Sequence, residues 1–328
     1  MSEKLNMALV GVGRIGITHL NTMLQCEKVC LKAIVDPNEE VGRKYAEMYN
    51  VDYYKDVSEL AGRDDIEAVN ICVPEEYHMV TAIAAAKIGK HIMIEKPLAK
   101  TYEECQAMIK AAKENNVRLF CALTCHSMAQ YRAVRQEYQR GKIGEFVEAS
   151  IRRYGPRSIM EFLKGRVTIG FYIAVHDLDA IQWMTGHKIT EVYAIRINKL
   201  NAYGEDGYDM AFKFDNGASG TMNINWVLNE GFPGSVCDVD IVGDKGILRM
   251  QPYTSGIQEY TDKQLYVSGT GYNIDGQMIG TFPMQMNHFA DAVMNNKEFI
   301  VDAEEAAYSV KVVEAVLRSA DSGKPELV

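Results

Sequence analysis

The sequence has no long hydrophobic run and no excess of positive charge among its 328 residues. Its longest apolar runs, such as 82–86 and 92–94, fall far short of the roughly 20 residues that a membrane-spanning helix needs. The chain has 35 Lys and Arg against 44 Asp and Glu, and a net charge of -9 disfavours nucleic acid, whose phosphates require clustered cations. We therefore expect neither a membrane nor a nucleic acid as partner.

Cysteine patterns typical of metal sites are also missing. None of the 7 cysteines forms a Cys-x-x-Cys pair, and no Cys or His pair stands nearby at the spacing that zinc sites use. We therefore predict no metal site, and reduced thiols in a cytoplasmic protein. The start, Met1–Lys4, runs straight into a strand-like segment, so we expect no signal peptide.

The residues that are present suit a globular protein, with 47% hydrophobic and 24% charged side chains. At roughly 150 residues per domain, the length predicts two domains. Residues 1–124 alternate strand-like runs with helical patterns, which implies parallel strands joined by right-handed crossovers. We predict a Rossmann doubly wound parallel sheet there, with strands at 6–10, 30–35, 68–73, 91–94 and 117–122 and helices at 15–25, 41–49, 77–88 and 102–114.

The pattern changes after about residue 125. Strand candidates then follow one another without intervening helices, and Asn216-Gly217 is a strong hairpin signal. We predict an α+β domain over 125–328 with a mostly antiparallel sheet and helices on one face. Its expected strands are 146–153, 208–214, 218–225, 236–242 and 247–250, and its expected helices are 129–140, 171–184, 286–295 and 304–320. Residues 251–283 show little periodicity, and the pattern leaves open whether the last helix packs back on the first domain.

The strongest functional signal is a glycine loop directly between the first strand and the first helix. It reads Gly11-Val12-Gly13-Arg14-Ile15-Gly16. In this position the first glycine permits a tight turn, the second lets the backbone approach a pyrophosphate, and the third lets helix and strand pack closely. The helix start, with Arg14 and Ile15, then presents free N–H groups to the phosphates. The loop therefore predicts a dinucleotide site.

An acidic residue ends the second strand, where a ribose-binding carboxylate is expected. Asp36 stands 25 positions after Gly11. It can accept hydrogen bonds from both adenosine ribose hydroxyls, whereas a 2′-phosphate would meet like charge at a cost of about 4 kcal/mol at 4 Å. No Arg follows directly, so we predict NAD rather than NADP as cofactor; a plain Asp-Pro turn is the alternative.

Lys96, in the segment Glu95-Lys96-Pro97, follows the apolar strand at 91–94, at the sheet edge where ligands of parallel sheets lie. This segment and several others resemble the Gfo/Idh/MocA family, the group of glucose–fructose oxidoreductase and inositol dehydrogenase. The resemblance covers nearly the whole chain. Its segments are the glycine loop, Asp36, 73–78 (VPEEYH), 89–91 (GKH), 95–99 (EKPLA) and 176–179 (HDLD).

The resemblance implies a catalytic pair and further cofactor contacts. In this family the Lys of the Glu-Lys-Pro segment and a His at a central-domain helix start act on the substrate carbinol, roles that fall here on Lys96 and His176. It also implies a homodimer or homotetramer that buries the second domain's sheet. The cofactor contacts that it implies are Cys72, Val73, Pro74, His78, Glu95 and Lys96.

Spacing supports the position of His176 independently. Tyr172, His176, Asp179 and Trp183 stand at i, i+4, i+7 and i+11, on one helix face. Many members of the family carry Asp one turn before this His, where this chain has Tyr172. That tyrosine either hydrogen-bonds substrate or packs, and inositol specificity does not follow.

Further substrate candidates flank the start of the second domain. His126 stands where the chain enters that domain, and Tyr154 and Arg157 follow a strand close to Arg152 and Arg153. Arginines there either grip an acidic or phosphorylated group or are simply solvated. Trp226 offers a sugar-stacking face, although packing in the core is the more common role.

These observations predict an NAD-dependent dehydrogenase that moves hydride between a nicotinamide and a sugar, polyol or sugar-derivative carbinol. One alternative is a redox-assisted glycosidase or eliminase that recycles bound NAD. The other is a non-catalytic NAD-binding sensor. The sequence does not determine the sugar, the carbon, the stereochemistry or the direction.

Overall fold

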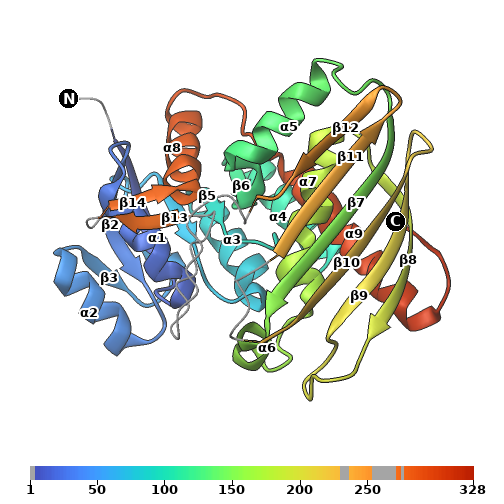
Figure 1. The fold of residues 1–328 in the computed structure, drawn as a ribbon. Helices are drawn as coiled ribbons and strands as arrows, with labels where there is room; N and C mark the ends of the chain where they lie inside the picture. The colour runs from blue at the N-terminus through green and yellow to red at the C-terminus, as the bar shows by residue number, and fades with distance from the viewer. Residues whose placement is uncertain (1–3, 230–235, 253–270, 275–276) are drawn as a thin grey trace. The chain divides into compact units, whose positions relative to one another are not determined.

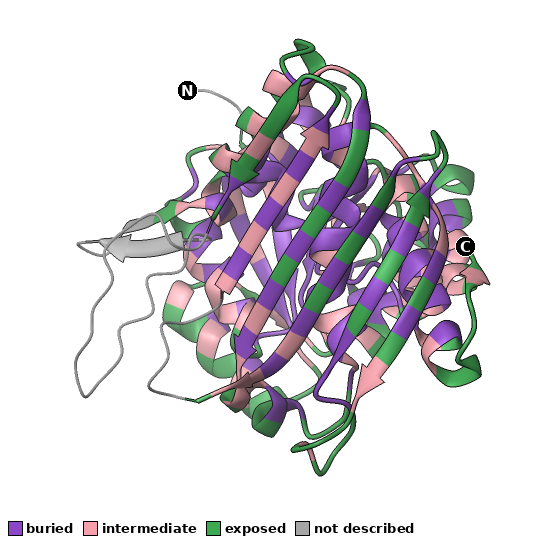
Figure 2. Cartoon of the chain, turned by 45° about the vertical axis from the view of Figure 1, so that its right-hand side comes forward, coloured by how far each residue is buried: buried purple, intermediate pink, exposed green. Residues whose placement is uncertain are grey.

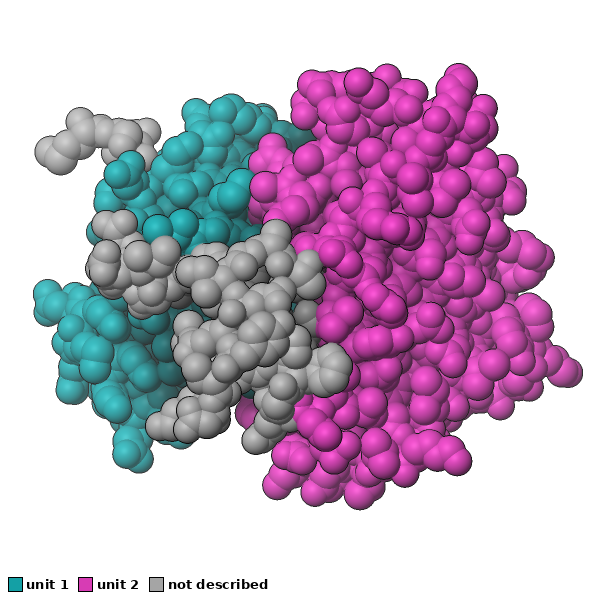
Figure 3. Space-filling view, viewed as in Figure 1, with its two compact units in different colours: residues 1–124, 270–308 teal, residues 125–269, 309–328 magenta. Residues whose placement is uncertain are grey.

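The computed structural model describes residues 4–229, 236–252, 271–274 and 277–328. These residues form two compact units, within Met1–Thr124 and Thr270–Tyr308 and within Cys125–Gly269 and Ser309–Val328 (Figure 3). The boundary between Tyr308 and Ser309 falls inside one helix, α9 (Ala303–Ser322). In the part of the chain described, no helix is both long enough and apolar enough to cross a membrane.

The first unit is built on a six-stranded, fully parallel sheet, which confirms the predicted doubly wound fold (Figure 1). Its strand order, β3-β2-β1-β4-β5-β6, is the dinucleotide-binding order that reverses beside β1. The strands are β1 (Leu5–Val10), β2 (Val29–Val35), β3 (Asp52–Tyr54), β4 (Ala68–Ile71), β5 (His91–Ile94) and β6 (Leu119–Cys121). β4 is buried along its whole length, which explains its unbroken apolar sequence.

The helices between these strands begin and end at recognisable caps. Asn38 and Thr101 accept backbone N–H groups at the starts of α2 and α4, and Gly89 follows α3 with a positive φ of 74°. The crossover elements are α1 (Arg14–Gln25), α2 (Glu39–Tyr49), the short 3₁₀ turns η1 (Val57–Leu60) and η2 (Glu75–Tyr77), α3 (His78–Lys87) and α4 (Tyr102–Glu114).

A later part of the chain returns to this unit. The hairpin of β13 (Gly271–Ile274) and β14 (Gln277–Gly280) leads into α8 (Thr281–Met294), and α8 contacts α1, β1 and β2. The segment predicted to lack periodicity lies partly outside the described residues, which omit 253–270 and 275–276.

The second unit contains a seven-stranded mixed sheet in the order β12-β11-β7-β10-β9-β8-β15. Every pair is antiparallel except β7 with β10, so the prediction of a mostly antiparallel sheet is confirmed. The strands are β7 (Phe146–Pro156), β8 (Ile189–Ile197), β9 (Gly207–Phe214), β10 (Ser219–Leu228), β11 (Val236–Gly243), β12 (Gly246–Met250) and β15 (Glu326–Leu327).

One face of this sheet is open and the other carries the helices. Burial alternates along β9 and β10, and Figure 2 shows the open face with the helices of the unit behind it. Gly217, at φ +87°, supports the β9–β10 hairpin that Asn216-Gly217 predicted. The helical elements are η3 (Thr124–Ser127), α5 (Ala129–Gln139), α6 (Arg157–Leu163), the π-helical turn η4 (Gly170–Ala174), α7 (Val175–Thr185) and the second part of α9.

Candidate active site

The glycine loop lies between β1 and α1 in the conformation that the sequence predicts. Gly11 has φ +90°, and a Cβ there would stand 2.9 Å from the carbonyl oxygen of Cys72. A Cβ on Gly16 would stand 2.1 Å from the Gly11 oxygen, so this glycine lets α1 approach β1. A Cβ on Gly13 would meet nothing within 4 Å. The close packing of the chain therefore requires glycine at positions 11 and 16, whereas the space beside Gly13 is not filled by protein atoms.

This open space fits a dinucleotide pyrophosphate. Gly13 is exposed and stands at the N-terminal end of α1, where helix N–H groups and the helix dipole favour anions. Arg14, the first residue of α1, is also exposed, and Ile15 is half-buried. Gly13 therefore presents bare backbone to the position that a phosphate would take.

Asp36 is held beside the same loop. Its Oδ2 accepts the Val12 N–H at 2.9 Å, and its Oδ1 accepts the Asn38 N–H at 2.9 Å. The hydroxyl of Tyr53 donates to the Asp36 carbonyl at 3.0 Å. The carboxylate is half-buried and fixed in place, with lone pairs remaining on each oxygen, which suits the ribose hydroxyls of a dinucleotide.

Lys96 is carried by a tightly anchored turn at the carboxyl end of β5. Glu95 continues the strand, since its N–H donates to the Ile71 oxygen at 3.0 Å, and its Oε2 accepts the Lys96 N–H at 3.1 Å. The Lys96–Pro97 peptide is cis, and the Lys96 side chain is half-buried. The lysine therefore stands where ligands of parallel sheets bind.

Two histidines of this unit contact the same turn. His78 is buried, with Nδ1 2.8 Å from the Pro97 oxygen and Nε2 3.1 Å from the Val73 oxygen. Burial lowers its pKa, against the opposing effect of these backbone carbonyls. Its ring therefore holds the turn, although the sequence placed His78 among the cofactor contacts. The neighbouring Cys72 is also buried, and burial raises the pKa of its thiol.

The second histidine, His19, was missed by the sequence interpretation. It lies in α1, is 1% exposed, and its Nε2 stands 2.8 Å from Glu95 Oε1. The two residues are 76 positions apart, so no local pattern links them. A polar residue on the buried face of α1, three residues after Gly16, was the available signal.

His176 is the second residue of α7 and is half-buried, as is Tyr172. The preceding turn, η4, is π-helical, a rare conformation that is frequent at functional sites. Gly170 allows this turn to pack closely, because a Cβ there would stand 3.1 Å from Val313 of α9. The structure thus places Tyr172 and His176 on adjoining turns of one continuous helical segment.

Asp179 and His126 are brought together inside the second unit. His126 Nε2 stands 2.6 Å from Asp179 Oδ2, and Ser309 donates to Asp179 Oδ1 at 3.0 Å. The sequence predicted both residues as substrate contacts, but His126 is 0% and Asp179 2% exposed. Their polar groups bind one another inside the unit. This placement favours a structural role, in which they hold α7 in position, rather than direct contact with a substrate. Trp183, the last residue of the predicted face, packs against the His126 ring with the two ring centres 4.3 Å apart and the planes tilted by 33°.

The arginines near the end of β7 differ in their partners. Arg152 pairs with Asp238, and Arg153 pairs with buried Asp177 at 3.2 Å. Burial raises the pKa of Asp177, and the Arg153 charge opposes that rise. Arg157 begins α6, and its buried Nε has no hydrogen-bond partner among the described residues.

Tyr154 and Trp226 also lie at this end of the sheet. Tyr154 is half-buried on β7, and the Arg152 guanidinium lies 5.9 Å from its ring centre. Trp226 is 2% exposed and donates its Nε1–H to the Glu205 carbonyl at 2.9 Å, which places it in the core. Among the described residues, no group of three or more His, Cys, Asp or Glu could hold a metal ion.

The six-stranded parallel sheet, the glycine loop and the anchored Lys96 define a nicotinamide-dinucleotide oxidoreductase of the Rossmann class. Residues 5–123 match the oxidoreductase family with an NAD-binding Rossmann fold, and residues 139–327 match that family's C-terminal alpha/beta domain. The chain belongs to the Gfo/Idh/MocA oxidoreductase family, as the resemblance of its segments predicted.

The chain shares about a quarter of its aligned residues with individual curated relatives. The chain is 24% identical to scyllo-inositol 2-dehydrogenase (NAD(+)) of Bacillus subtilis, over 99% of this chain and 96% of that protein. It is 25% identical to myo-inositol 2-dehydrogenase of Thermotoga maritima, over 74% of each chain. It is also 27% identical to 2,7-anhydro-N-acetylneuraminate hydratase of Escherichia coli, over 75% of this chain and 70% of that protein.

The fold is shared with solved structures. Scyllo-inositol dehydrogenase from Lactobacillus casei, with bound NAD(H) and scyllo-inositol, superposes with a TM-score of 0.84 at 18% identity, over 99% of each chain. The aldose-aldose oxidoreductase of Caulobacter crescentus has a TM-score of 0.83 at 21% identity, over 99% of this chain and 100% of that one. These likenesses establish the fold.

Proposed function

We propose that this protein is an NAD-dependent dehydrogenase that oxidises a carbinol of a sugar, polyol or sugar derivative. The observation that carries the proposal is the Lys96 turn, fixed at the carboxyl end of β5 in a chain of this oxidoreductase family. Inositol dehydrogenases among its relatives support a polyol-like substrate. We assign cofactor binding to residues 1–124 and substrate binding and assembly to residues 125–328.

In this proposal two side chains act on one carbinol. The His176 imidazole acts as general base and accepts the hydroxyl proton. The Lys96 ammonium hydrogen-bonds the same oxygen and stabilises the negative charge that develops there. NAD, when bound, supplies the hydride acceptor. We assign substrate contacts to Tyr172, Tyr154 and Arg157, and a supporting role under α7 to His126 and Asp179.

We propose NAD rather than NADP because of Asp36. Its half-buried carboxylate is fixed beside the glycine loop, where a 2′-phosphate would meet like charge. The first turn of α2 adds Glu39 and Glu40, and Arg43 pairs with Glu39 at 2.7 Å. This region therefore offers a net negative field to the ribose end of a dinucleotide.

The test is NADH absorbance at 340 nm while the protein is mixed with NAD and a panel of sugars, inositols and sugar acids. We expect at least one compound to reduce NAD, and NADP to serve poorly with that compound. No reduction of either cofactor, with no chemical change in any compound, would favour a non-catalytic NAD-binding sensor and overturn the proposal.

A redox-assisted eliminase is a second candidate, favoured by the hydratase of Escherichia coli among the relatives. In such an enzyme the hydride taken from the substrate returns within one turnover. The same panel distinguishes the two, because product analysis by NMR would show substrate conversion without net NADH. A dehydrogenase instead forms one NADH for each product molecule.

We propose that the substrate carries an acidic group bound by Arg157. Its neighbours Arg152 and Arg153 have aspartate partners, whereas the Nε of Arg157 has none among the residues described. We expect Arg157→Gln to raise KM for the responding compound about tenfold, equal to about 1.4 kcal/mol of lost binding. Arg152→Gln is the matched control and should leave KM unchanged. A responding compound without an acidic group contradicts this assignment.

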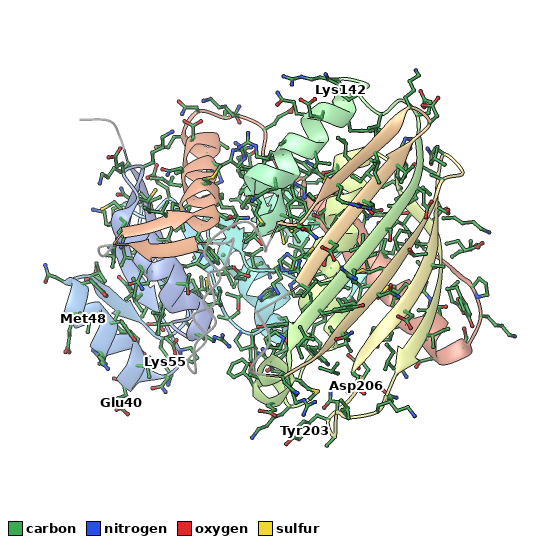
Figure 4. The ribbon with its side chains drawn as sticks, in the orientation of Figure 1. Glu40, Met48, Lys55, Lys142, Tyr203 and Asp206 are labelled. Carbon is green, nitrogen blue, oxygen red and sulfur yellow. The ribbon has the colours of Figure 1, made fainter. Side chains whose placement is uncertain are left out.

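We propose a homodimer or homotetramer assembled through the open face of the second unit's sheet. Exposed apolar side chains lie along that sheet, including Tyr193 and Ile195 of β8 at 39% and 53% exposed. Light scattering should give two or four times the 36.8 kDa chain mass. Ile195→Asp should lower that mass, and Met48→Asp, at an exposed position of α2 (Figure 4), should not. A monomer mass for the unaltered protein would contradict the proposal.

A cytoplasmic location fits this function. All 7 cysteines lie in the part of the chain that the structure describes, and none of them forms a disulfide, which suits a reducing compartment. Six of them are buried, and burial raises the pKa of Cys26 and Cys72. We therefore propose that the protein works in the cytoplasm with its thiols reduced.

A further inference from the structure

A chain of buried polar groups runs beneath the Lys96 turn. Asn70 on β4 stands with its Nδ2 2.8 Å from His19 Nδ1, and His19 Nε2 stands 2.8 Å from Glu95 Oε1. The other carboxylate oxygen of Glu95 accepts the Lys96 N–H at 3.1 Å. Asn70, His19 and Glu95 are 0%, 1% and 7% exposed. The backbone of the lysine is thereby linked to the interior of the sheet.

The position of this chain points to a role beyond stability. A buried carboxylate is costly unless it is paired, and an apolar pair of similar volume commonly stabilises a fold as well or better. His19 and Glu95 come from different elements, α1 and the end of β5, and α1 also carries the glycine loop. The pair thus connects the pyrophosphate turn to the Lys96 turn through two hydrogen bonds.

The pair is expected to be ionised. Burial opposes charge on His19, but the neighbouring Cys72 and Glu95 outweigh it and raise its pKa to about 10. Burial raises the pKa of Glu95, but the His19 hydrogen bond and charge, with Lys96, lower it overall. From α8, the uncharged ring of Phe282 packs on the His19 ring at 5.4 Å. Around neutral pH the pair therefore carries opposite charges that cancel.

We propose that His19 is a positioning residue for Lys96, acting through Glu95. The imidazole fixes the Glu95 carboxylate, and the carboxylate fixes the backbone N–H of Lys96. The inference rests on the proposed function only in assigning catalysis to Lys96. A second consequence is electrostatic: His19 neutralises the carboxylate next to the lysine, so an uncharged replacement leaves a net negative charge that stabilises the Lys96 ammonium.

The test compares His19→Leu with His19→Gln in the full-length protein. We expect His19→Leu to lower kcat about 100-fold, the cost of misplacing a reacting group by about 1 Å. The amide N–H of His19→Gln can donate to Glu95 Oε1, so this variant should recover most of kcat. Fluorescence titration should show NAD binding within about threefold of the unaltered protein in both variants, a factor below about 0.7 kcal/mol.

A second readout needs no turnover. Lysines carrying ¹³C-labelled methyl groups report their own pKa by NMR, and the Lys96 signal is identified by its loss in Lys96→Met. We expect the pKa of Lys96 to be higher in His19→Gln than in the unaltered protein. The basic limb of the kcat/KM profile should move to higher pH with it, whereas a purely structural role of His19 would move neither.

A matched control is His91→Gln, at the opposite end of β5, where His91 Nδ1 accepts the Arg118 N–H at 3.0 Å. It should leave kcat and the lysine titration unchanged. Full kcat in His19→Leu, or losses that only follow the melting temperature, would overturn the inference. If Lys96→Met itself kept full turnover, the proposed function would fail; if Lys96→Met lost turnover and His19→Leu did not, only this inference would fail.

Discussion

Lys96→Met and His176→Asn are each expected to lower kcat about 10²- to 10⁴-fold, the usual contribution of a positioned acid–base or charge-stabilising group. NAD binding should change little, since the glycine loop and Asp36 remain. Methionine keeps the length of the lysine side chain without its charge, and asparagine keeps a hydrogen-bonding group without a basic imidazole. Steady-state NADH formation with the compound found in the panel measures the loss.

Matched controls separate chemistry from folding in these variants. Lys100→Met removes an exposed lysine four positions later, and His187→Asn removes a histidine whose Nδ1 lies 2.9 Å from Asp215. Both controls should keep normal turnover. The double variant of Lys96 and His176 should have a kcat only slightly below that of the less active single variant. The effects of groups that act as a unit are not additive. Full turnover in either single variant would refute the assignment of that residue.

The first sheet could be predicted because its signals are local. Alternation of apolar runs with helical patterns predicted five of its strands, and only the short edge strand β3 of this sheet was missed. β8 was missed for a different reason: Tyr193 and Ile195 are apolar although exposed, so the two faces of that strand do not differ in the sequence. Helix α6 was also missed, because the chain leaves β7 at Pro156 and turns directly into it.

Sequence spacing predicted which residues share a helix face, but not how deep each lies. Tyr172 and His176 are half-buried, whereas Asp179, three positions on, is enclosed by His126 and Ser309. His19 shows the opposite failure, since its partner Glu95 is far away in the sequence. Contacts of this kind depend on how strands are ordered in the sheet, and a pattern along the chain does not contain that order.

Gly13→Ala is expected to abolish tight NAD binding without lowering the stability of the protein in the absence of NAD. A Cβ at this position meets nothing within 4 Å, so the free energy of unfolding should be unchanged, yet the methyl group would occupy the approach of the pyrophosphate. We expect the NAD dissociation constant to rise about 100-fold, or about 2.8 kcal/mol. Isothermal titration calorimetry measures the binding, and urea denaturation measures the stability.

Gly16→Ala should show the reverse pattern and serves as the matched comparison. Its Cβ would lie 2.1 Å from the Gly11 carbonyl oxygen, so α1 must shift away from β1 before any cofactor binds. Overpacking of this kind lowers the free energy of unfolding by about 1–3 kcal/mol, and the loss should appear without NAD. The two variants therefore distinguish two roles of glycine in this loop. Gly13 leaves space for the ligand, and Gly16 allows α1 to pack closely against β1. Normal NAD binding by Gly13→Ala would show that the pyrophosphate does not lie against this turn.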